Sequence, residues 1–240
     1  MERIKGTLYG VSVGPGDPEL LTFKAMRIMR RCPVIAAPQT KSGEMLALDI
    51  ARQAVDLSRK VIVPLHFTMS HDEAERHKAH RAAADILRGY LDEGQDVAML
   101  NLGDVSVYAT FGYLQAILEE QGYPTAMVAG VPSFCAVAAR LNQPLTGGMD
   151  TPLTIAPGSI PLEEILAAPG AKVLMKSGRQ LPQVMAALER ADLLEESALV
   201  CNCGLPEEQV WDNLKQEQPE GSAGYFATLL VKQGGKEPKA

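Results

Sequence analysis

The sequence contains no apolar run that approaches the ~20 residues of a membrane-spanning helix, and its N-terminus lacks the pattern of a signal peptide. It has only four cysteines, which form neither a C-x-x-C pair nor a disulfide framework and so favour the reduced cytoplasm. The net charge of −6 argues against a nucleic-acid partner, which would usually meet a basic surface. We therefore expect a cytoplasmic protein that binds neither membranes nor nucleic acid.

Apolar residues make up 46% of the chain, which is sufficient for a sizeable core in one large or two small domains. Up to Ala129, short apolar runs alternate with amphipathic segments of helical period. This alternation predicts an α/β domain with five strands in a mostly parallel sheet and helices on both faces. The strands are expected at the run from Leu8, Val34–Ala37, Lys60–Pro64, Asp96–Asn101 and Thr125–Ala129, and the helices at Leu20–Arg31, Glu44–Ala54, Asp72–Glu93 and Ala109–Gln121.

A change of texture marks a candidate domain junction at Asn142–Gly158, which is rich in proline, threonine and glycine. The prediction is an N-terminal α/β domain over residues 1–143 and a smaller, mixed α/β domain over residues 144–240. The second domain is expected to be mixed because residues 204–224 are too irregular for a crossover helix. Its strands are expected at Thr151–Ala156, Lys172–Lys176, Ala198–Cys203 and Gly224–Lys232, and its helices at Leu162–Ala167 and Leu181–Ala191.

The first strand ends in Gly14-Pro15-Gly16-Asp17-Pro18, ahead of an amphipathic helix. The glycines allow a ligand to approach the main chain, and the prolines stiffen the loop. A binding loop at the carboxyl end of a strand and a plain strand–helix connection both fit this pattern. It is neither a dinucleotide fingerprint, because Glu19 occupies the third glycine position, nor a P-loop.

Two later segments have the same form. After a buried strand, Gly103-Asp104 opens a turn in which Asp104 either caps the turn or accepts a hydrogen bond from a ligand. After the next strand, Gly130-Val-Pro leads to Ser133, which is also a candidate helix N-cap. Since the carboxyl ends of parallel strands share one edge of a sheet, the three loops predict a binding cleft there.

These three segments carry a resemblance to a known family. Gly10-Val-Ser-Val-Gly-Pro-Gly-Asp-Pro-Glu-Leu-Leu-Thr22, Leu102-Gly-Asp-Val-Ser-Val-Tyr108 and Gly130-Val-Pro-Ser-Phe134 are similar, in that order, to the tetrapyrrole (precorrin) methylases. The chain most resembles the branch that methylates C20 of precorrin-2 or cobalt-factor II. Further support comes from Asn142–Leu145, Val173–Ser177 and Tyr225–Lys232. Val105 stands where the common motif, Gly-Asp-Pro, has proline.

The resemblance implies a two-domain enzyme of cobalamin biosynthesis, a homodimer, with S-adenosylmethionine in an active-site cleft between the domains. The residues implied to bind this cofactor are Gly103, Asp104, Val107, Tyr108, Ser133, Phe134, Met175, Lys176, Cys203 and Gly204. The loop implied to face the tetrapyrrole consists of Val13, Gly14, Pro15, Gly16 and Asp17. Asp104 or Tyr108 is the candidate acceptor for the proton lost from the methylated carbon.

Methyl transfer from a sulfonium needs neither a metal nor a covalent nucleophile, because the donor carries its own leaving group, so we expect catalysis by positioning and no metal site. The substrate carries carboxylates although the protein is acidic, and cations must therefore line the cleft. The candidates near predicted loops are Lys24, Lys41, Lys176 and Arg179.

Other patterns have ordinary explanations beside functional ones. His77 and His80 share a helix face and fit either a metal site or a solvated polar helix. Cys201 and Cys203 fit either a redox pair or small core residues, and the second interpretation is favoured because C-x-C lacks the geometry of a C-x-x-C site. Two rival functions also stand: a sister methylase acting on another carbon or substrate, and a nucleotide-binding regulatory module without turnover.

Overall fold

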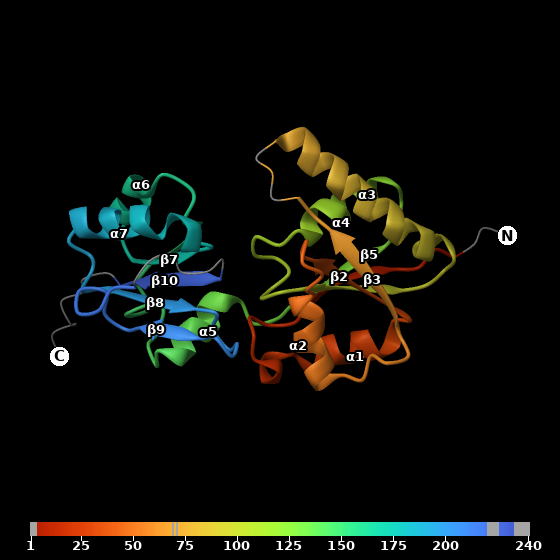
Figure 1. Cartoon of the computed structure of the whole chain (residues 1–240), viewed down its shortest axis with the longest axis horizontal. Helices are drawn as coiled ribbons and strands as arrows, with labels where there is room; N and C mark the ends of the chain where they lie inside the picture. Colours follow the sequence, from red (N-terminus) through yellow and green to blue (C-terminus); the bar gives the residue numbers. More distant parts are fainter. Residues whose placement is uncertain (1–3, 69, 71, 220–225, 233–240) are drawn as a thin grey trace. The chain divides into compact units, whose positions relative to one another are not determined.

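The computed structural model describes residues 4–68, 70, 72–219 and 226–232, and its contacts divide the chain into two compact units, Met1–Pro132 and Ser133–Ala240 (Figure 1). The sequence predicts this boundary after residue 143. The difference is helix α5, Ser133–Arg140, which packs on strand β10 of the second unit. From the sequence, a helix that follows a parallel strand is assigned to the domain of that strand. Its packing on β10, far along the chain, shows that α5 belongs to the second unit.

The first unit is built on a five-stranded sheet in the order β3-β2-β4-β1-β5, and every adjacent pair is parallel. The prediction of a parallel five-stranded sheet is confirmed. The central strand β4 is buried along its whole length, as expected when helices cover both faces. The strands are β1 Leu8–Ser12, β2 Val34–Gln39, β3 Val61–His66, β4 Val97–Asn101 and β5 Thr125–Val128.

Helices cover both faces of this sheet, with α3 and α4 on one face and α1 and α2 on the other (Figure 1). The helices are α1 Phe23–Arg31, α2 Leu46–Ala54, α3 Glu73–Asp92 and α4 Phe111–Glu120. Phe111 is fully buried at the start of α4. Its ring lies 2.7 Å from where a Cβ on Gly10 would be, so β1 and α4 approach closely only because position 10 lacks a side chain.

The first helix begins three residues later than predicted. Pro18–Leu20 forms a separate 3-10 turn, η1, and α1 starts after Thr22, whose hydroxyl accepts a hydrogen bond from the Ala25 N–H at 3.1 Å. The apolar stripe of the sequence continues across this break, so periodicity alone merges the two elements. The threonine cap satisfies one of the N–H groups that a helix start leaves unpaired.

The two helices on one face of the first sheet meet through an aromatic stack. The His80 ring of α3 lies parallel to the Tyr113 ring of α4, with 4.5 Å between the ring centroids. His80 is buried, and its pKa is lowered, chiefly because burial disfavours the charged ring and further because His77 and Arg76 repel it. His77 is exposed and lies 3.4 Å from Glu73.

The lowered pKa of His80 predicts a loss of stability in mild acid. Because the unfolded chain binds a proton more readily at this residue, the free energy of unfolding should fall as the pH drops below the ordinary imidazole pKa of about 6.5. Urea unfolding measured between pH 8 and pH 5 checks this. His80→Phe, which retains a stacking ring, should remove this contribution and flatten the acid-side decline. His77→Gln, which removes only the lesser repulsion, should flatten it much less. An equally steep decline in His80→Phe contradicts the assignment.

The second unit is a mixed α/β unit, as predicted. Its sheet has the order β6-β7-β10-β8-β9, in which β6 and β7 are parallel and the other pairs antiparallel. Its strands are β6 Leu153–Pro157, β7 Ala171–Met175, β8 Ser197–Cys201, β9 Gln209–Trp211 and β10 Ala227–Val231. The short β9 is absent from the sequence prediction. Gly224 and Tyr225 of the predicted last strand lie outside the described residues.

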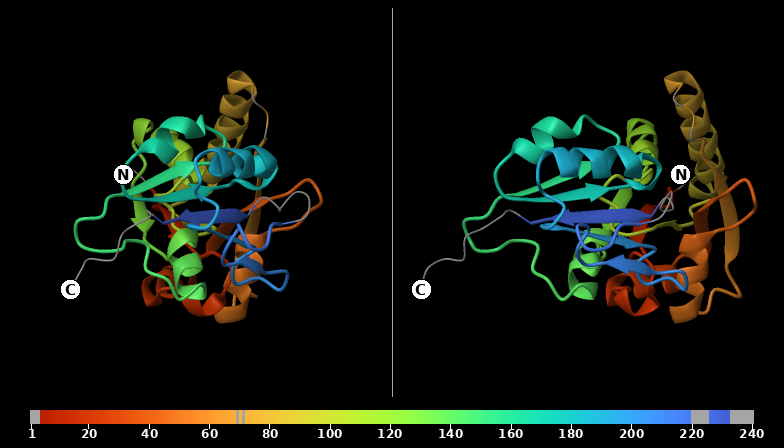
Figure 2. Two further views of the ribbon diagram at one scale, coloured as in Figure 1. Left: turned by 90° about the vertical axis from the view of Figure 1, so that its left-hand side faces the viewer. Right: turned by 60° about the vertical axis from the view of Figure 1, so that its left-hand side comes forward.

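Helices α6, Leu162–Ala167, and α7, Leu181–Arg190, pack on one face of the second sheet, and α5 lies on the other (Figure 2). A 3-10 turn, η2 Gly178–Gln180, precedes α7. The apolar sides of α6 and α7 join the strands in one core that includes Leu166, Leu188 and Leu199. Across the described part of the chain, no helix combines the length and the apolar character needed to cross a bilayer.

Candidate active site

The three loops singled out in the sequence meet at one edge of the first sheet. Gly14 and Gly103 exchange backbone hydrogen bonds, at 3.3 Å from the Gly14 N–H and 2.8 Å from the Gly103 N–H. The Asp104 Oδ2 atom accepts a hydrogen bond from the Gly130 N–H at 2.7 Å. The predicted convergence of the loops after β1, β4 and β5 is therefore confirmed.

A buried serine joins two of these loops from below. The Ser12 hydroxyl is fully buried and accepts a hydrogen bond from the Val105 N–H at 2.8 Å. Proline, the common residue at this position of the motif, has no N–H to donate. The departure at Val105 thus adds a contact between β1 and the loop after β4. Ser12 is not among the site residues predicted from the sequence. A polar residue at the end of an otherwise largely apolar strand is the sequence feature that could have indicated it.

Gly130 is required by the closeness of its neighbours. A Cβ at this position would lie 2.3 Å from the Ser12 Cβ and 3.2 Å from the Gly103 carbonyl oxygen. Real Cβ atoms do not approach another atom to 2.3 Å, so glycine is needed for the third loop to lie against the other two.

Asp104 holds the loops together with both carboxylate oxygens. The Oδ1 atom accepts hydrogen bonds from the Ser106 N–H at 2.8 Å and from the Ser106 hydroxyl, while Oδ2 accepts from Gly130. Burial by itself raises the pKa of Asp104, but these hydrogen bonds outweigh it and hold the pKa below its ordinary value. Asp104 is consequently a weak base that closes its own turn.

The predicted substrate loop is packed into the first unit. The Val13 side chain is fully buried, and Pro15 and Gly16 are buried as well. Gly14 has a φ of 76°, a left-handed angle that suits glycine. The Asp17 Oδ1 atom accepts a hydrogen bond from the Glu19 N–H at 2.8 Å and so caps η1. Within this loop, Val13 and Asp17 thus have structural roles.

The cofactor residues predicted in the second unit gather at one end of its own sheet. Because β10 runs antiparallel to β7 and β8, its first residues lie beside the ends of those strands, with Thr228 opposite Met175. The Ser133 hydroxyl at the start of α5 lies 3.4 Å from that of Thr228. The remaining predicted residues are Phe134, buried in α5, Lys176, which follows β7, and Cys203 and Gly204, which follow β8.

Left-handed backbone is concentrated in these same segments. Tyr108 and Lys176 have φ values of 47° and 55°, which cost residues of these types roughly 1–3 kcal/mol, whereas Asn202, at 53°, is of a type that adopts this region more readily. Two further examples, Asn142 and Asp192, follow helices, where such a residue is an ordinary terminator. The first three follow strands or lie in the loop after β4, and strain retained at such places is typical of functional sites.

The four predicted cations divide between the two units. Lys24 is exposed on α1, and Lys41 is exposed in the turn after β2. Lys176 is half-buried after β7, and Arg179 is exposed in η2. Of these, Lys41 lines a pocket.

Comparison with known protein families identifies the class to which this chain belongs. Residues 7–217 match the model of the Tetrapyrrole (Corrin/Porphyrin) Methylases. The chain belongs to this family.

Relatives within the family match nearly the whole chain. The cobalt-precorrin-2 C(20)-methyltransferase of Salmonella typhimurium is 34% identical to this chain over an alignment that covers 95% of this chain and 97% of the relative. The precorrin-2 C(20)-methyltransferase of a Sinorhizobium species is 30% identical over 94% of this chain and 95% of its own. Among solved structures, the uroporphyrin-III C-methyltransferase of Thermus thermophilus, complexed with S-adenyl homocysteine, has the same fold, with a TM-score of 0.68 and 22% identity over 95% of this chain and 92% of that chain.

Proposed function

We propose that the protein is an S-adenosylmethionine-dependent C-methyltransferase that methylates C20 of precorrin-2 or cobalt-factor II during assembly of the cobalamin ring. The observation that carries this proposal is the identity of 34% to a cobalt-precorrin-2 C(20)-methyltransferase along nearly the full length of both chains. The three loops lie against one another at Gly14, Gly103 and Gly130, and this arrangement supports a binding function for them.

The residues that follow the strands of the two units suit a donor with a flat aromatic base and polar groups. In the first unit, Gly103, Asp104, Val107 and Tyr108 bind it. In the second unit, the binding residues are Ser133, Phe134, Met175, Lys176, Cys203 and Gly204. The Ser133 and Thr228 hydroxyls offer hydrogen bonds close together, and Met175 and Phe134 are apolar, which supports this assignment.

The role of the chain in the reaction is to position the tetrapyrrole relative to the methyl donor. When bound, S-adenosylmethionine supplies a methyl group attached to a positively charged sulfur, and the neutral thioether is the leaving group. The loop from Val13 to Asp17 holds the tetrapyrrole, and the hydrogen bonds that join the loops fix the angle of approach. Asp104 keeps its carboxylate in internal hydrogen bonds and acts as a positioning residue. Tyr108, which is 45% exposed, is the candidate acceptor for the proton lost from the methylated carbon.

The protein is further proposed to be a cytoplasmic homodimer without a membrane or nucleic-acid partner. The acidic balance of the sequence supports the absence of a nucleic-acid partner, and the four free cysteines support the compartment. The dimer rests on the family resemblance. Light scattering coupled to size-exclusion chromatography tests it, since a mass of one chain at micromolar concentration contradicts the dimer.

Calorimetry tests the proposed activity. We expect S-adenosylhomocysteine to bind with a Kd in the micromolar range, while NAD and ATP give no heat. Incubation of the protein with S-adenosylmethionine and either metal-free precorrin-2 or cobalt-factor II should then give a product with one added methyl group, located at C20 by NMR. A methyl group on another carbon would indicate a sister methylase, and nucleotide binding without turnover would indicate a regulatory module.

A further inference from the structure

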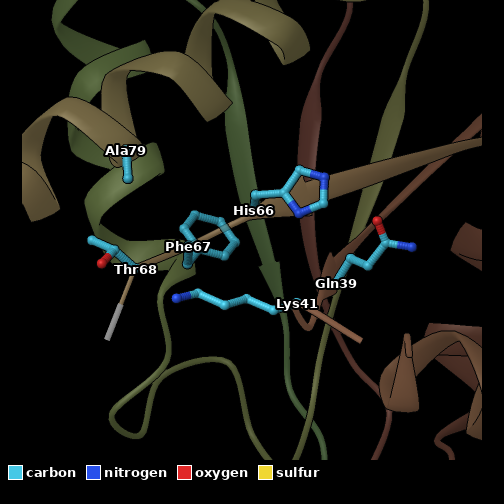
Figure 3. A pocket seen from close by; sticks show the side chains of 6 residues that line it. All are labelled: Gln39, Lys41, His66, Phe67, Thr68 and Ala79. Carbon is cyan, nitrogen blue, oxygen red and sulfur yellow. The ribbon is translucent and has the colours of Figure 1, made fainter. Parts of the chain in front are cut away.

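A small pocket lies in the first unit at the carboxyl ends of β2 and β3, apart from the glycine loops. It has a volume of about 250 Å³. Ligand pockets for whole drug-sized molecules are usually about 300–1,000 Å³, so this one suits a side group better than an entire substrate. The described residues that line it are Gln39, Lys41, His66, Phe67, Thr68 and Ala79 (Figure 3).

Strand register places two of the polar side chains of this pocket beside each other. Gln39 and His66 end β2 and β3 and are paired with each other, so they point to the same side of the sheet. Leu65 is fully buried and the next residue, His66, is exposed, as alternation along a strand requires. The edge strand β3 therefore places an imidazole at its exposed end.

A tight turn after β2 carries the lysine. The Thr40 N–H donates to the Glu44 carbonyl, and the Glu44 N–H donates back to the Thr40 hydroxyl, at 2.9 Å and 3.0 Å. The Gln39 amide nitrogen donates to the Gly43 carbonyl at 2.9 Å and fastens the turn to the strand. In Figure 3 the Lys41 side chain runs past Phe67 with its nitrogen directed toward Thr68.

The apolar wall of the pocket is fixed by the core. Phe67 packs against the core of the first unit, and its ring centroid lies 6.0 Å from that of the buried His80. Ala79 of α3 contributes only a methyl group, which leaves room beside the ring. The pocket thus has an apolar wall, along which the Lys41 side chain runs, and polar groups around it.

The polar groups of the pocket suit an anion. The lining offers the three donors of an ammonium group, an imidazole, a hydroxyl and an amide. No carboxylate occurs among the described lining residues, although the chain carries a net charge of −6. A carboxylate on an apolar arm matches both sides of this pocket.

The pocket shares an edge of the sheet with the predicted substrate loop. In the order β3-β2-β4-β1-β5, β2 and β3 lie two and three strands from β1, which is about 10–15 Å at the usual strand spacing. All five strands are parallel, so their carboxyl ends face the same way. A macrocycle resting on the Val13–Asp17 loop can therefore extend a peripheral arm into the pocket.

We propose that this pocket binds a peripheral carboxylate of the tetrapyrrole, and that Lys41 and His66 are specificity-determining residues for the substrate. The proposal rests on the proposed function in that it takes a tetrapyrrole as substrate. It adds a subsite outside the glycine loops and selects Lys41 from the four cations that the sequence offered.

Steady-state kinetics of Lys41→Gln, His66→Gln and the double variant test the proposal. Both side chains are exposed, so each contact is expected to be modest, with KM for the tetrapyrrole rising about fivefold in each single variant and about 20-fold in the double variant. The value of kcat and the Kd for S-adenosylhomocysteine should change less than twofold. Lys78→Gln, the same charge change on α3 outside the lining residues, should leave KM unaltered.

Direct binding of uroporphyrin, a stable porphyrin rich in carboxylates, provides a measurement that needs no turnover. We expect the double variant to bind it at least tenfold more weakly than the unaltered protein, by fluorescence titration. Equal affinity in both proteins, or no binding by the unaltered protein, overturns the subsite. Failure of the proposed function is seen separately, as absent binding of S-adenosylhomocysteine.

Discussion

Asp104→Asn is expected to weaken the binding of S-adenosylhomocysteine roughly 10- to 100-fold and to lower kcat/KM at least as much. The carboxylate accepts hydrogen bonds on both oxygens, from Ser106 and from Gly130. An asparagine amide has one oxygen and one NH₂ group, so whichever way it points, one of these N–H donors meets another donor. A buried donor left unpaired costs about 1–3 kcal/mol, and here it loosens two loops at once.

Calorimetry with S-adenosylhomocysteine measures the first effect, and methylation rates measure the second. Asp85→Asn is a matched control, because it makes the same change at an exposed residue of α3 whose partner is Arg88 at 3.0 Å. The control should bind and turn over as the unaltered protein does. Binding by Asp104→Asn within twofold of that level would show that the carboxylate does not organise the site.

Most of the fold could be predicted because its strands and helices depend on local patterns of apolar and polar residues. The wholly apolar run of β4 indicates a strand covered on both faces, and the alternation with amphipathic helices indicates parallel connections. Element ends were less predictable. Leu20 belongs to a 3-10 turn and not to α1, since the cap at Thr22 depends on one hydroxyl rather than on periodicity.

The site was predictable only in part, because its geometry rests on contacts between distant residues. The glycines of the three loops mark positions where main chain comes close, and this is visible in the sequence. The role of Ser12 depends on Val105, far along the chain, and the Ser133–Thr228 contact joins α5 to β10. The left-handed angle of Lys176 has no local signal, because lysine is not a residue that prefers it.

The domain boundary was misplaced for the same physical reason. Proline and glycine between residues 142 and 158 correctly suggest a change of structure, but α5 ends before that segment and packs on β10. Which sheet a helix covers depends on what it packs against, and α5 packs on β10, the final strand of the described chain. A composition shift therefore locates a loop, whereas the packing of Phe134 and its neighbours locates the unit.

Gly130→Ala is expected to have the largest effect on stability among the substitutions considered. The added methyl group would lie 2.3 Å from the Ser12 Cβ, inside the contact that binds the third loop to β1. Overpacking of this kind costs about 1–3 kcal/mol, which corresponds to a fall in Tm of roughly 3–10 °C for a protein of this size. Moving the loop aside to relieve the clash would break the hydrogen bond from Gly130 to Asp104, so binding of S-adenosylhomocysteine should fall together with stability.

Gly112→Ala separates this steric effect from the general effect of replacing glycine. Gly112 is exposed in α4, and no atom lies within 4 Å of the place that an added methyl group would occupy, so alanine should stabilise the helix by about 0.5–1 kcal/mol. Thermal melts of the two variants should therefore shift in opposite directions, and only Gly130→Ala should lose donor binding. If Gly130→Ala melted like the unaltered protein and bound S-adenosylhomocysteine normally, the loops could not be held as tightly as the hydrogen bonds through Asp104 require.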